Sequence, residues 1–348
     1  MKAKLIVGAA VAAACAGAAA PLEAGAPPAA LCPSPSPQAV VRTVTLPGRP
    51  GFLLLTGRTL WVAIAARRPG GRGKLARVDA RSGRVERTFR LPVNPYRIAY
   101  GFGSLWLTGE ARAATRRYAG GVLRLDPRTG RILRVIHGPI LLGSAIAATP
   151  DGIWVGGGDV YPEGHPDRSG VRFVFKIDPR RNAVTQRIRL RTTTVIDLLA
   201  EGRALWATGW GAVVKLSPSG RVLYQRRFYG SGWSLALSEN AVWVAQPFSG
   251  NRFPRTQRPV RRLLQATIRP PHLAVTELDV PPGLLDAAGD IVWMTGPGGL
   301  VRIPASRRPV TLQRIPVTAL PDHVAAFDGG VWGSVHHTHR LVEICWSD

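Results

Sequence analysis

The sequence lacks the usual signatures of metal, redox and nucleotide chemistry. Only three of its 348 residues are Cys, and none of them forms a Cys-x-x-Cys pair. Acidic residues are scarce, with 21 Asp and Glu against 46 Lys and Arg, which argues against an array of calcium loops. There is no phosphate loop and no Gly-x-Ser-x-Gly nucleophile motif. We therefore expect no cofactor and assign no catalytic residue from a motif.

Lysine is also scarce, because only 5 of the 46 cations are Lys and the other 41 are Arg. Such a skew, together with abundant Ala, Gly and Pro, is typical of a GC-rich genome and by itself indicates no ligand. The alternative is a surface for phosphate or anionic glycan, since guanidinium groups bind such anions through paired hydrogen bonds. Nucleic acid is not the partner that we expect.

Long hydrophobic runs are missing after the first residues of the chain. Lys2 and Lys4 precede an apolar segment, Leu5 to Ala14, which is too short to span a membrane and is typical of a secretory signal. Two endings are open: lipidation of Cys15 after a lipobox-like Ala-Ala-Ala, or ordinary cleavage within 16–30. We expect a signal peptide over 1–15, an Ala/Pro/Ser-rich tether over 16–37 and one folded domain over 38–348, so that the protein is secreted or lipid-anchored and touches the membrane only through that anchor.

The rest of the chain is one repeated unit. An aliphatic residue followed by Trp recurs seven times, at spacings of 37 to 52 positions from one such Trp to the next. The seven are Trp61, Trp106, Trp154, Trp206, Trp243, Trp293 and Trp332. An aliphatic residue stands eight positions before every one of them. A second pattern, Asp-x-x-Thr/Ser-Gly-Arg, follows in several units and predicts a turn between two strands.

Each unit therefore holds about four short strands, which is the pattern of a β-propeller blade. We predict an all-β, seven-bladed propeller with four-stranded blades and a Trp packed between each pair of blades. The seventh unit has only three strands, and Val40–Leu46 matches the fourth strand of the first unit, Val85–Leu91. The N-terminal strand should thus complete the last blade beside Arg340–Ile344 and leave no open sheet edge.

The closure also brings two cysteines together. Aligning Cys345 with Asp79 of the first unit places Ser34, two residues from Cys32, opposite it. We therefore predict a Cys32–Cys345 disulfide, which an oxidising compartment permits.

The repeated Leu-Trp-Val and Asp-Pro-x-Thr-Gly-Arg-Val patterns resemble bacterial extracytoplasmic propellers of the YVTN and virginiamycin B lyase-like group, from Val40 to the C-terminus. The resemblance implies the architecture and the compartment, but such propellers include lyases, quinoproteins, sensors and scaffolds. Virginiamycin B lyases repeat Leu-Trp-Phe-Thr-Glu, and only Leu105–Glu110 comes near, with an inserted Gly109. The catalytic His, Glu and Mg²⁺ of that family have no clear counterpart.

The predicted channel mouth is the first candidate site. The positions nine and ten residues before each Trp vary in type, whereas the neighbouring aliphatic position does not. A polar and aromatic pocket is predicted there from Tyr96, Arg97, Asp197, Trp233, Asp322 and His323. The bland alternative is a solvated channel with incidental charges.

The connections after the Trp strands form the second candidate site, because the longest of them should emerge on one face. They carry Arg67, Arg68, Arg116, Arg117, Arg258, Arg261 and Arg262, which would form an anion-binding surface unless they are merely solvated. A weaker possibility is a transition-metal site at His336, His337 and His339, although no Cys or carboxylate lies close by in sequence.

These observations favour a monomeric binding module or scaffold at the cell envelope, which recognises an anionic envelope polymer or a partner protein through the long-loop face. The alternative is an enzyme, a lyase or hydrolase, with its site at the channel mouth and His323 acting as base beside Asp322 or Asp197.

Overall fold

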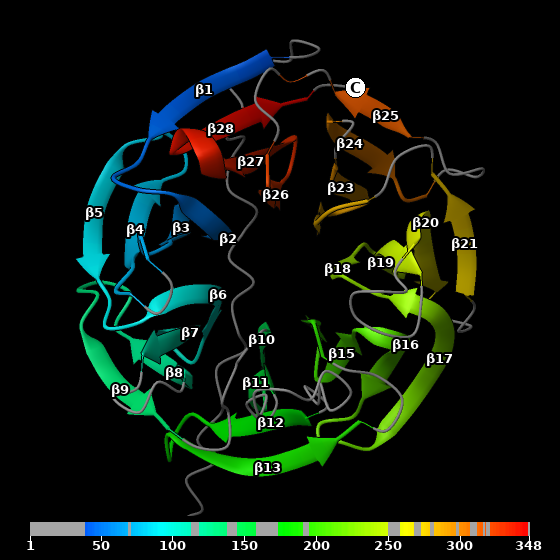
Figure 1. Ribbon diagram of the computed structural model, residues 1–348, viewed down its shortest axis with the longest axis horizontal. Coiled ribbons are helices and arrows are strands. Elements are labelled where there is room, and N and C mark those ends of the chain that lie inside the picture. Colours follow the sequence, from blue (N-terminus) through cyan, green and yellow to red (C-terminus); the bar gives the residue numbers. More distant parts are fainter. Residues whose placement is uncertain are drawn as a thin grey trace, which may run out of the picture.

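The described part of the chain folds into antiparallel sheets arranged in a closed ring (Figure 1). The structure is a computed structural model that describes residues 39–68, 71–112, 118–137, 145–157, 173–190, 195–249, 258–267, 273–278, 282–296, 299–306, 312–315, 317 and 321–346. The predicted signal peptide, tether and lipidation site at Cys15 lie outside these residues. Seven blades of four strands radiate from the centre, so the predicted seven-bladed β-propeller is confirmed.

Each blade runs from an innermost to an outermost strand. The first blade contains β2 (Pro50–Thr56), β3 (Thr59–Ile64), β4 (Lys74–Asp79) and β5 (Val85–Arg90). The second contains β6 (Asn94–Gly101), β7 (Ser104–Arg112), β8 (Tyr118–Leu125) and β9 (Ile132–Ile136), and the third β10 (Ala145–Thr149), β11 (Gly152–Gly157), β12 (Phe173–Asp178) and β13 (Ala183–Arg189). The fourth contains β14 (Asp197–Glu201), β15 (Ala204–Thr208), β16 (Trp210–Leu216) and β17 (Val222–Ser231).

The remaining blades continue the pattern. The fifth contains β18 (Ser234–Leu237), β19 (Ala241–Ser249), β20 (Arg258–Thr267) and β21 (Leu273–Glu277), and the sixth β22 (Leu285–Ala288), β23 (Ile291–Gly296), β24 (Gly299–Pro304) and β25 (Gln313–Ile315). The seventh contains β26 (His323–Phe327), β27 (Gly330–Val335), β28 (Arg340–Cys345) and, from the other end of the chain, β1 (Ala39–Thr45). A short 3₁₀ helix, η2 (His336–Thr338), connects β27 to β28, and no described helix is long and apolar enough to cross a membrane.

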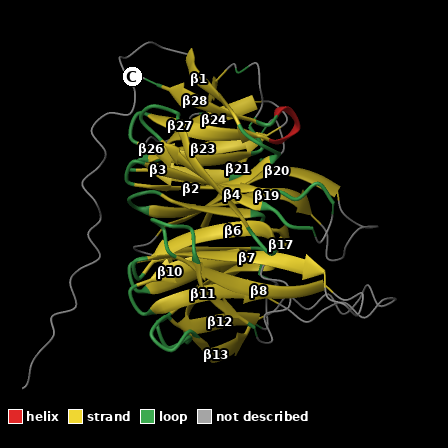
Figure 2. Ribbon diagram, turned by 90° about the vertical axis from the view of Figure 1, so that its left-hand side faces the viewer, coloured by secondary structure: helices red, strands yellow, loops and turns green. Residues whose placement is uncertain are grey.

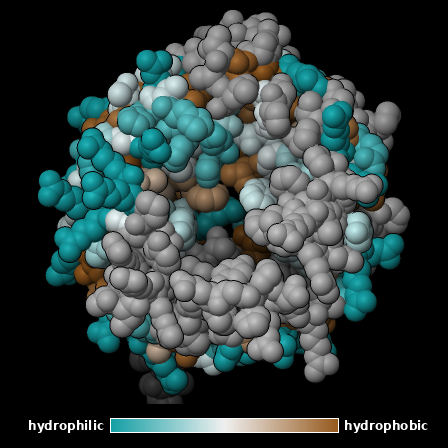
Figure 3. Space-filling model, in the orientation of Figure 1, coloured by the Kyte–Doolittle hydropathy of each residue, from teal (hydrophilic) through white to brown (hydrophobic). Residues whose placement is uncertain are grey.

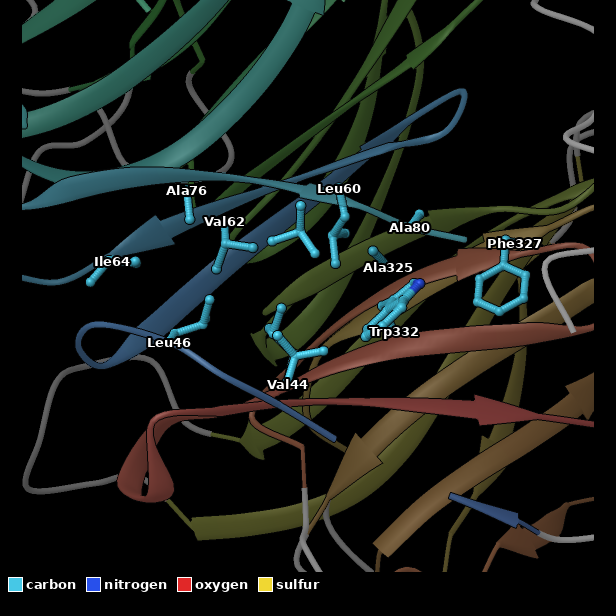
Figure 4. Packing of buried hydrophobic residues seen from close by; sticks show 12 residues of the cluster. Val44, Leu46, Leu60, Val62, Ile64, Ala76, Ala80, Ala325, Phe327 and Trp332 are labelled. Carbon is cyan, nitrogen blue, oxygen red and sulfur yellow. The ribbon is translucent and has the colours of Figure 1, made fainter. Parts of the chain in front are cut away.

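The repeated Trp holds neighbouring blades together. All seven side chains are at most 2% exposed, and each one packs in a cluster with aliphatic residues of the following blade. Trp332 of β27, for example, belongs to one buried cluster with Leu60 and Val62 of β3, which Figure 4 shows at the junction of the last and first blades. Burying a large apolar ring at every junction explains why this position does not vary.

The Asp-containing turns form as the sequence predicts. The Asp79 carboxylate accepts a hydrogen bond from the backbone N–H of Ser82 at 2.7 Å, and Gly83 takes a positive φ of 70°. In the second blade, the Asp126 carboxylate accepts from Arg128 N–H at 2.8 Å, and Gly130 has a φ of 68°. These turns join third to fourth strands and define one face of the ring, named here the turn face.

The ring closes through strands from the two ends of the chain. β1 pairs antiparallel with β28, with Arg42 opposite Glu343 and Val44 opposite Leu341, which confirms the predicted closure. The expected position of the cysteine partner needs correction, because Ala39 rather than Ser34 lies opposite Cys345. The first blade shows the reason: Asp79 N–H donates to the Arg84 carbonyl at 2.9 Å, and Arg84 aligns with Ala39, so the strands already pair at this end of the turn. Cys32 lies outside the described residues, so the disulfide stays a prediction.

The fourth and fifth blades are joined more closely than the others. β17 continues past its own blade, and its last residue, Ser231, pairs with Phe248 of β19, so that one sheet of eight strands spans both blades. Gly211 and Gly230 take positive φ values of 90° and 119° where β17 leaves β16. Glycine accommodates this backbone because it has no Cβ.

The two faces of the ring differ in their connections (Figure 2). The short turns between first and second strands lie with the Asp-containing turns on the turn face. The connections between second and third strands, whose described parts include residues 65–68, residues 71–73 and η2, lie on the other side, named here the long-loop face. The first strands begin at that face, so their first residues approach the ring centre from it.

Candidate functional site

A central cavity of about 330 Å³ is lined by the innermost strands. Figure 3 shows the ring centre hollowed on the long-loop face. Six of the seven residues that stand nine positions before the repeated Trp line this cavity: Phe52, Arg97, Asp197, Ser234, Leu284 and His323. The structure thus brings together Arg97, Asp197 and His323 of the predicted pocket.

Arg97 and Asp197 form an ion pair inside the cavity. Arg97 Nη1 lies 3.3 Å from Asp197 Oδ1, and the guanidinium lies 3.8 Å from the centroid of the Phe52 ring. Asp197 also accepts hydrogen bonds from the backbone N–H groups of Leu198 and Leu235, at 3.0 and 2.9 Å. Burial raises the pKa of Asp197, although the charge of Arg97 and the hydrogen bonds oppose this rise. Burial likewise lowers the pKa of Arg97, although the charge of Asp197 opposes this fall. The Nε of Arg97 is buried without a hydrogen-bond partner.

His323 is an uncharged member of the cavity wall. Its ring meets the Phe52 ring edge-on, with 4.0 Å between the centroids, and its Nδ1 is buried without a hydrogen-bond partner. Burial, followed by the positive charges of Arg97 and His336, lowers the pKa of His323 to about 3. A general base needs a pKa closer to the working pH and a group that orients the imidazole. Among the described contacts, neither Asp322 nor Asp197 bonds to His323.

Asp286 is a cavity residue that the sequence pattern did not assign. Its Oδ1 accepts from Ala287 N–H at 2.9 Å and its Oδ2 from Ala326 N–H of the next blade at 2.8 Å. Burial, reinforced by the charge of Asp197, raises its pKa to about 6. A signal was present, because the position seven residues before the Trp is Leu or Ala in the other six units.

The cavity's polar side chains connect neighbouring blades. Asp197 of the fourth blade accepts from Leu235 N–H of the fifth, at 2.9 Å. Ser234 Oγ of the fifth accepts from Leu285 N–H of the sixth at 3.1 Å, and Asp286 of the sixth accepts from Ala326 N–H of the seventh at 2.8 Å. Three consecutive junctions are therefore bridged at the ring centre by side chains that satisfy buried backbone donors.

The other residues of the predicted pocket do not line the cavity. Tyr96 is half-buried, and Trp233 is 39% exposed, but neither belongs to the cavity wall. Asp322 Oδ2 accepts from the backbone N–H of His336 at 2.6 Å and anchors η2. Trp233 and Asp322 stand just before β18 and β26, and the pairing of β6 is irregular between Pro95 and Ile98, so the position ten residues before the Trp is not part of a regular innermost strand in these blades.

The three histidines after β27 do not form a metal site with their described neighbours. His336 Nδ1 lies 3.1 Å from the carbonyl oxygen of Pro50, and the His336 and His337 rings meet edge-on. Across the described residues, no three His, Cys, Asp or Glu side chains are placed to hold a metal ion.

The predicted arginine surface is spread over separate blades. Arg67 and Arg68 are exposed on the β3–β4 connection of the first blade. Arg261 and Arg262 lie within β20 of the fifth blade, which corrects their assignment to a loop, because β19 and β20 extend further than their aliphatic cores predict. Arg258 begins the same strand, and Arg116 and Arg117 lie outside the described residues. Arg262 Nε is already paired with Glu277 Oε1 at 2.6 Å.

No protein-family model matches the chain, and no curated protein matches its sequence. Solved structures match its fold. Hydrazine synthase from Kuenenia stuttgartiensis is similar with a TM-score of 0.66 and 14% identity, over 87% of this chain and 97% of that one. The WD40 domain of Neurospora crassa Pan2 gives 0.65 and 11% over 88% and 94%, and a chain of a mitotic checkpoint complex gives 0.69 and 13% over 94% and 98%. Identities this low support the β-propeller fold and nothing narrower.

Proposed function

We propose that the protein is a binding module in which the propeller is a rigid scaffold and the long-loop face recognises an anionic envelope polymer or an acidic partner protein. The observation that carries this proposal is the use of the cavity's polar groups. Asp197, Ser234 and Asp286 each accept a backbone hydrogen bond from the next blade, and His323 is neutral and bonded to neither carboxylate. This arrangement favours a structural role for the ring centre over acid–base catalysis.

The charge of the long-loop face supports an anionic ligand. Arg67, Arg68 and Arg261 are exposed, and the chain carries 46 cations against 21 acidic residues. Exposed guanidinium groups attract anions over a distance of roughly 8 Å at physiological salt. Binding should therefore weaken steeply as the salt concentration rises.

The test compares matched triple variants in binding to dextran sulfate. Arg67→Ser, Arg68→Ser and Arg261→Ser together should weaken binding roughly tenfold. The control combines Arg84→Ser, Arg128→Ser and Arg131→Ser on the turn face, which removes the same charge and should weaken binding less than about twofold. Equal losses would show that net charge alone acts, and a wild-type protein that does not bind would overturn the proposal.

We further propose that the protein works outside the cytoplasm as a monomer related to the YVTN and virginiamycin B lyase-like group. The basic and apolar N-terminal segment supports export, and Cys15 would carry a lipid anchor. Cys345, 3% exposed at the end of β28, would pair with Cys32 and join the chain ends. In the chain-entropy model such a disulfide contributes on the order of 5 kcal/mol. Free Cys32 and Cys345 thiols in the unfolded, non-reduced protein would contradict the pairing, and a palmitate analogue should label the wild type but not Cys15→Ser.

A further inference from the structure

A second concave surface lies on the side wall of the ring, between the fourth and fifth blades. β17 pairs with β16 up to Arg227, opposite Ala212, and meets it again only at Ser231, opposite Trp210. The intervening residues bulge away from the blade, and Gln246 of the fifth blade holds them by donating from Nε2 to the Tyr229 carbonyl at 2.6 Å. The result is a groove of about 420 Å³ bounded by β17 on one side and by β20 and β21 on the other.

The groove combines positive charge with exposed apolar surface. Arg226 and Arg227 are exposed on the β17 wall, and β17 contains no acidic residue. No described acidic side chain forms an ion pair with either of them; Glu277, the acidic residue of the groove, is paired with Arg262. Tyr229 is 58% exposed and Val275 of the opposite wall is 53% exposed. A contiguous exposed apolar surface beside unpaired cations is typical of a binding surface rather than of a solvated strand.

We propose that this groove binds an extended acidic segment of a partner protein, in which acidic side chains alternate with apolar ones. Acidic side chains would pair with Arg226 and Arg227, and apolar ones would cover Tyr229 and Val275. An extended chain presents successive side chains to opposite sides, which suits a groove that has Arg226 and Arg227 on the β17 wall and Val275 on the opposite wall. A sulfated polysaccharide would satisfy the cations but would leave Tyr229 and Val275 exposed. The groove includes Arg262 of the predicted long-loop arginines, but the two tests change different residues, Arg226, Arg227 and Tyr229 here and Arg67, Arg68 and Arg261 there, so either proposal can fail without the other.

The experiment measures the binding of two fluorescent peptides of equal length and charge to the full-length protein. One peptide alternates Glu with Leu, and the other alternates Glu with Ser. The Glu–Leu peptide should bind roughly threefold to tenfold more tightly, because it covers apolar surface as well as charge. Arg226→Ser with Arg227→Ser should weaken both peptides roughly fivefold. Tyr229→Ser should remove most of the preference for Leu and leave the Glu–Ser peptide almost unchanged.

Two controls keep the result specific. Arg128→Ser with Arg131→Ser on the turn face removes the same charge and should change either affinity less than about twofold. Hydrogen exchange of residues 226–229 should slow when the Glu–Leu peptide binds, which reports on the groove even if a variant loses stability. The proposal is overturned if the turn-face pair weakens peptide binding as much as the β17 pair does, or if only Arg67→Ser with Arg68→Ser abolishes peptide binding. A single-stranded oligonucleotide serves as a further probe. If it binds more tightly than the Glu–Leu peptide, and if the Arg226→Ser, Arg227→Ser variant loses that binding, the groove does not select a peptide and the proposal is overturned.

Discussion

The Trp site of the closing blade differs from the Trp sites of the first five blades in its polar partners. In the third blade, Trp154 Nε1 donates to Thr149 Oγ1 at 3.0 Å, and Lys176 Nζ lies 5.0 Å from the ring centroid. In the closing blade, Phe327 stands at the position of Thr149, and Trp332 Nε1 is buried without a partner. Glu343 faces Trp332 across the strands, as Lys176 faces Trp154.

The difference shows which part of the repeat is fixed by packing and which is not. Both rings are 0% exposed and lie against the next blade, so the apolar requirement is identical. The polar shell differs because β26 and β28 carry Phe327 and Glu343 where the third blade has Thr149 and Lys176, and because the fourth strand of the closing blade, β1, comes from the other end of the chain. That strand supplies Arg42, whose Nη1 lies 3.5 Å from Glu343 Oε2. Glu343 is 0% exposed, neither of its carboxylate oxygens has a hydrogen-bond partner, and burial raises its pKa to about 7.

Glu343→Gln should produce the largest change. The pKa of Glu343 rises from 4.5 in the unfolded chain to about 7 in the fold, so the folded state holds this proton more tightly. The contribution of Glu343 to stability is therefore full below about pH 4.5 and is lost as the pH rises through about 7. Glu343→Gln should raise the free energy of unfolding at about pH 8 by up to about 3 kcal/mol and flatten its pH dependence, measured by urea denaturation.

Three cavity groups must be separated from this effect. Asp286, with its pKa raised to about 6, changes stability with pH in the same direction, and so does Asp197, whose pKa burial also raises. The pKa of His323 is lowered from 6.5 to about 3, so His323 acts oppositely, because its contribution to stability is lost as the pH falls below 6.5. Adding Asp286→Asn to Glu343→Gln removes the first group, so stability should fall less steeply as the pH rises toward about 6 than in Glu343→Gln alone. A Glu343→Gln variant that is less stable at about pH 8 would mean that the Arg42 ion pair outweighs burial.

Trp→Phe substitutions at the two sites should differ by the polar partners alone. Trp154→Phe removes ring volume, the hydrogen bond to Thr149 and the contact with Lys176, so we expect a loss of about 2–3 kcal/mol. Trp332→Phe removes similar volume and also removes a buried donor that has no acceptor, so we expect a loss of about 1 kcal/mol. Equal losses in urea denaturation would show that the polar partners contribute little.

Lys176→Met should give the smallest effect. It removes the cation above Trp154 and the hydrogen bond from Nζ to the Pro218 carbonyl, at 2.8 Å, and we expect a loss of about 0.5–1 kcal/mol. Lys74→Met is the control, since Lys74 lies at the start of β4 and its contact with the Pro47 carbonyl, at 3.4 Å, is exposed. The melting temperature should fall for Lys176→Met and stay nearly constant for Lys74→Met.

The sequence was sufficient for features that every blade shares. The Trp and aliphatic positions recur because each junction needs the same buried volume, and they predicted the blade number and the closure by Val40–Leu46. The variable position nine residues before the Trp led to Arg97, Asp197 and His323, which lie where the innermost strands border the central cavity. The position ten residues before led to Trp233 and Asp322, which point elsewhere.

Features that occur in one blade could not be predicted in the same way. Asp286 is a single departure in an apolar position, and only its buried contacts with Ala287 and Ala326 show its role. The bulge of β17 lies where Gly211 of β16 and Gly230 of β17 both take a positive φ. An alignment of the repeats does not show that these two glycines lie on paired strands. The exposed wall at Arg226 and Tyr229 follows from that bulge and was therefore not anticipated.

The pairing of β1 with β28 also affects how the chain must fold. During synthesis β1 leaves the ribosome before any other strand. Its partner, β28, is the last strand of the sequence, so almost the whole ring is synthesised between the two. The blades formed by β2 to β25 need only neighbouring segments and can assemble in order, whereas β1 must remain without its partner until the end. A substitution or deletion in β1 would consequently disrupt the blade formed with β26, β27 and β28, which are distant in sequence. The first blade, which is close to β1 in sequence, would keep all four of its strands.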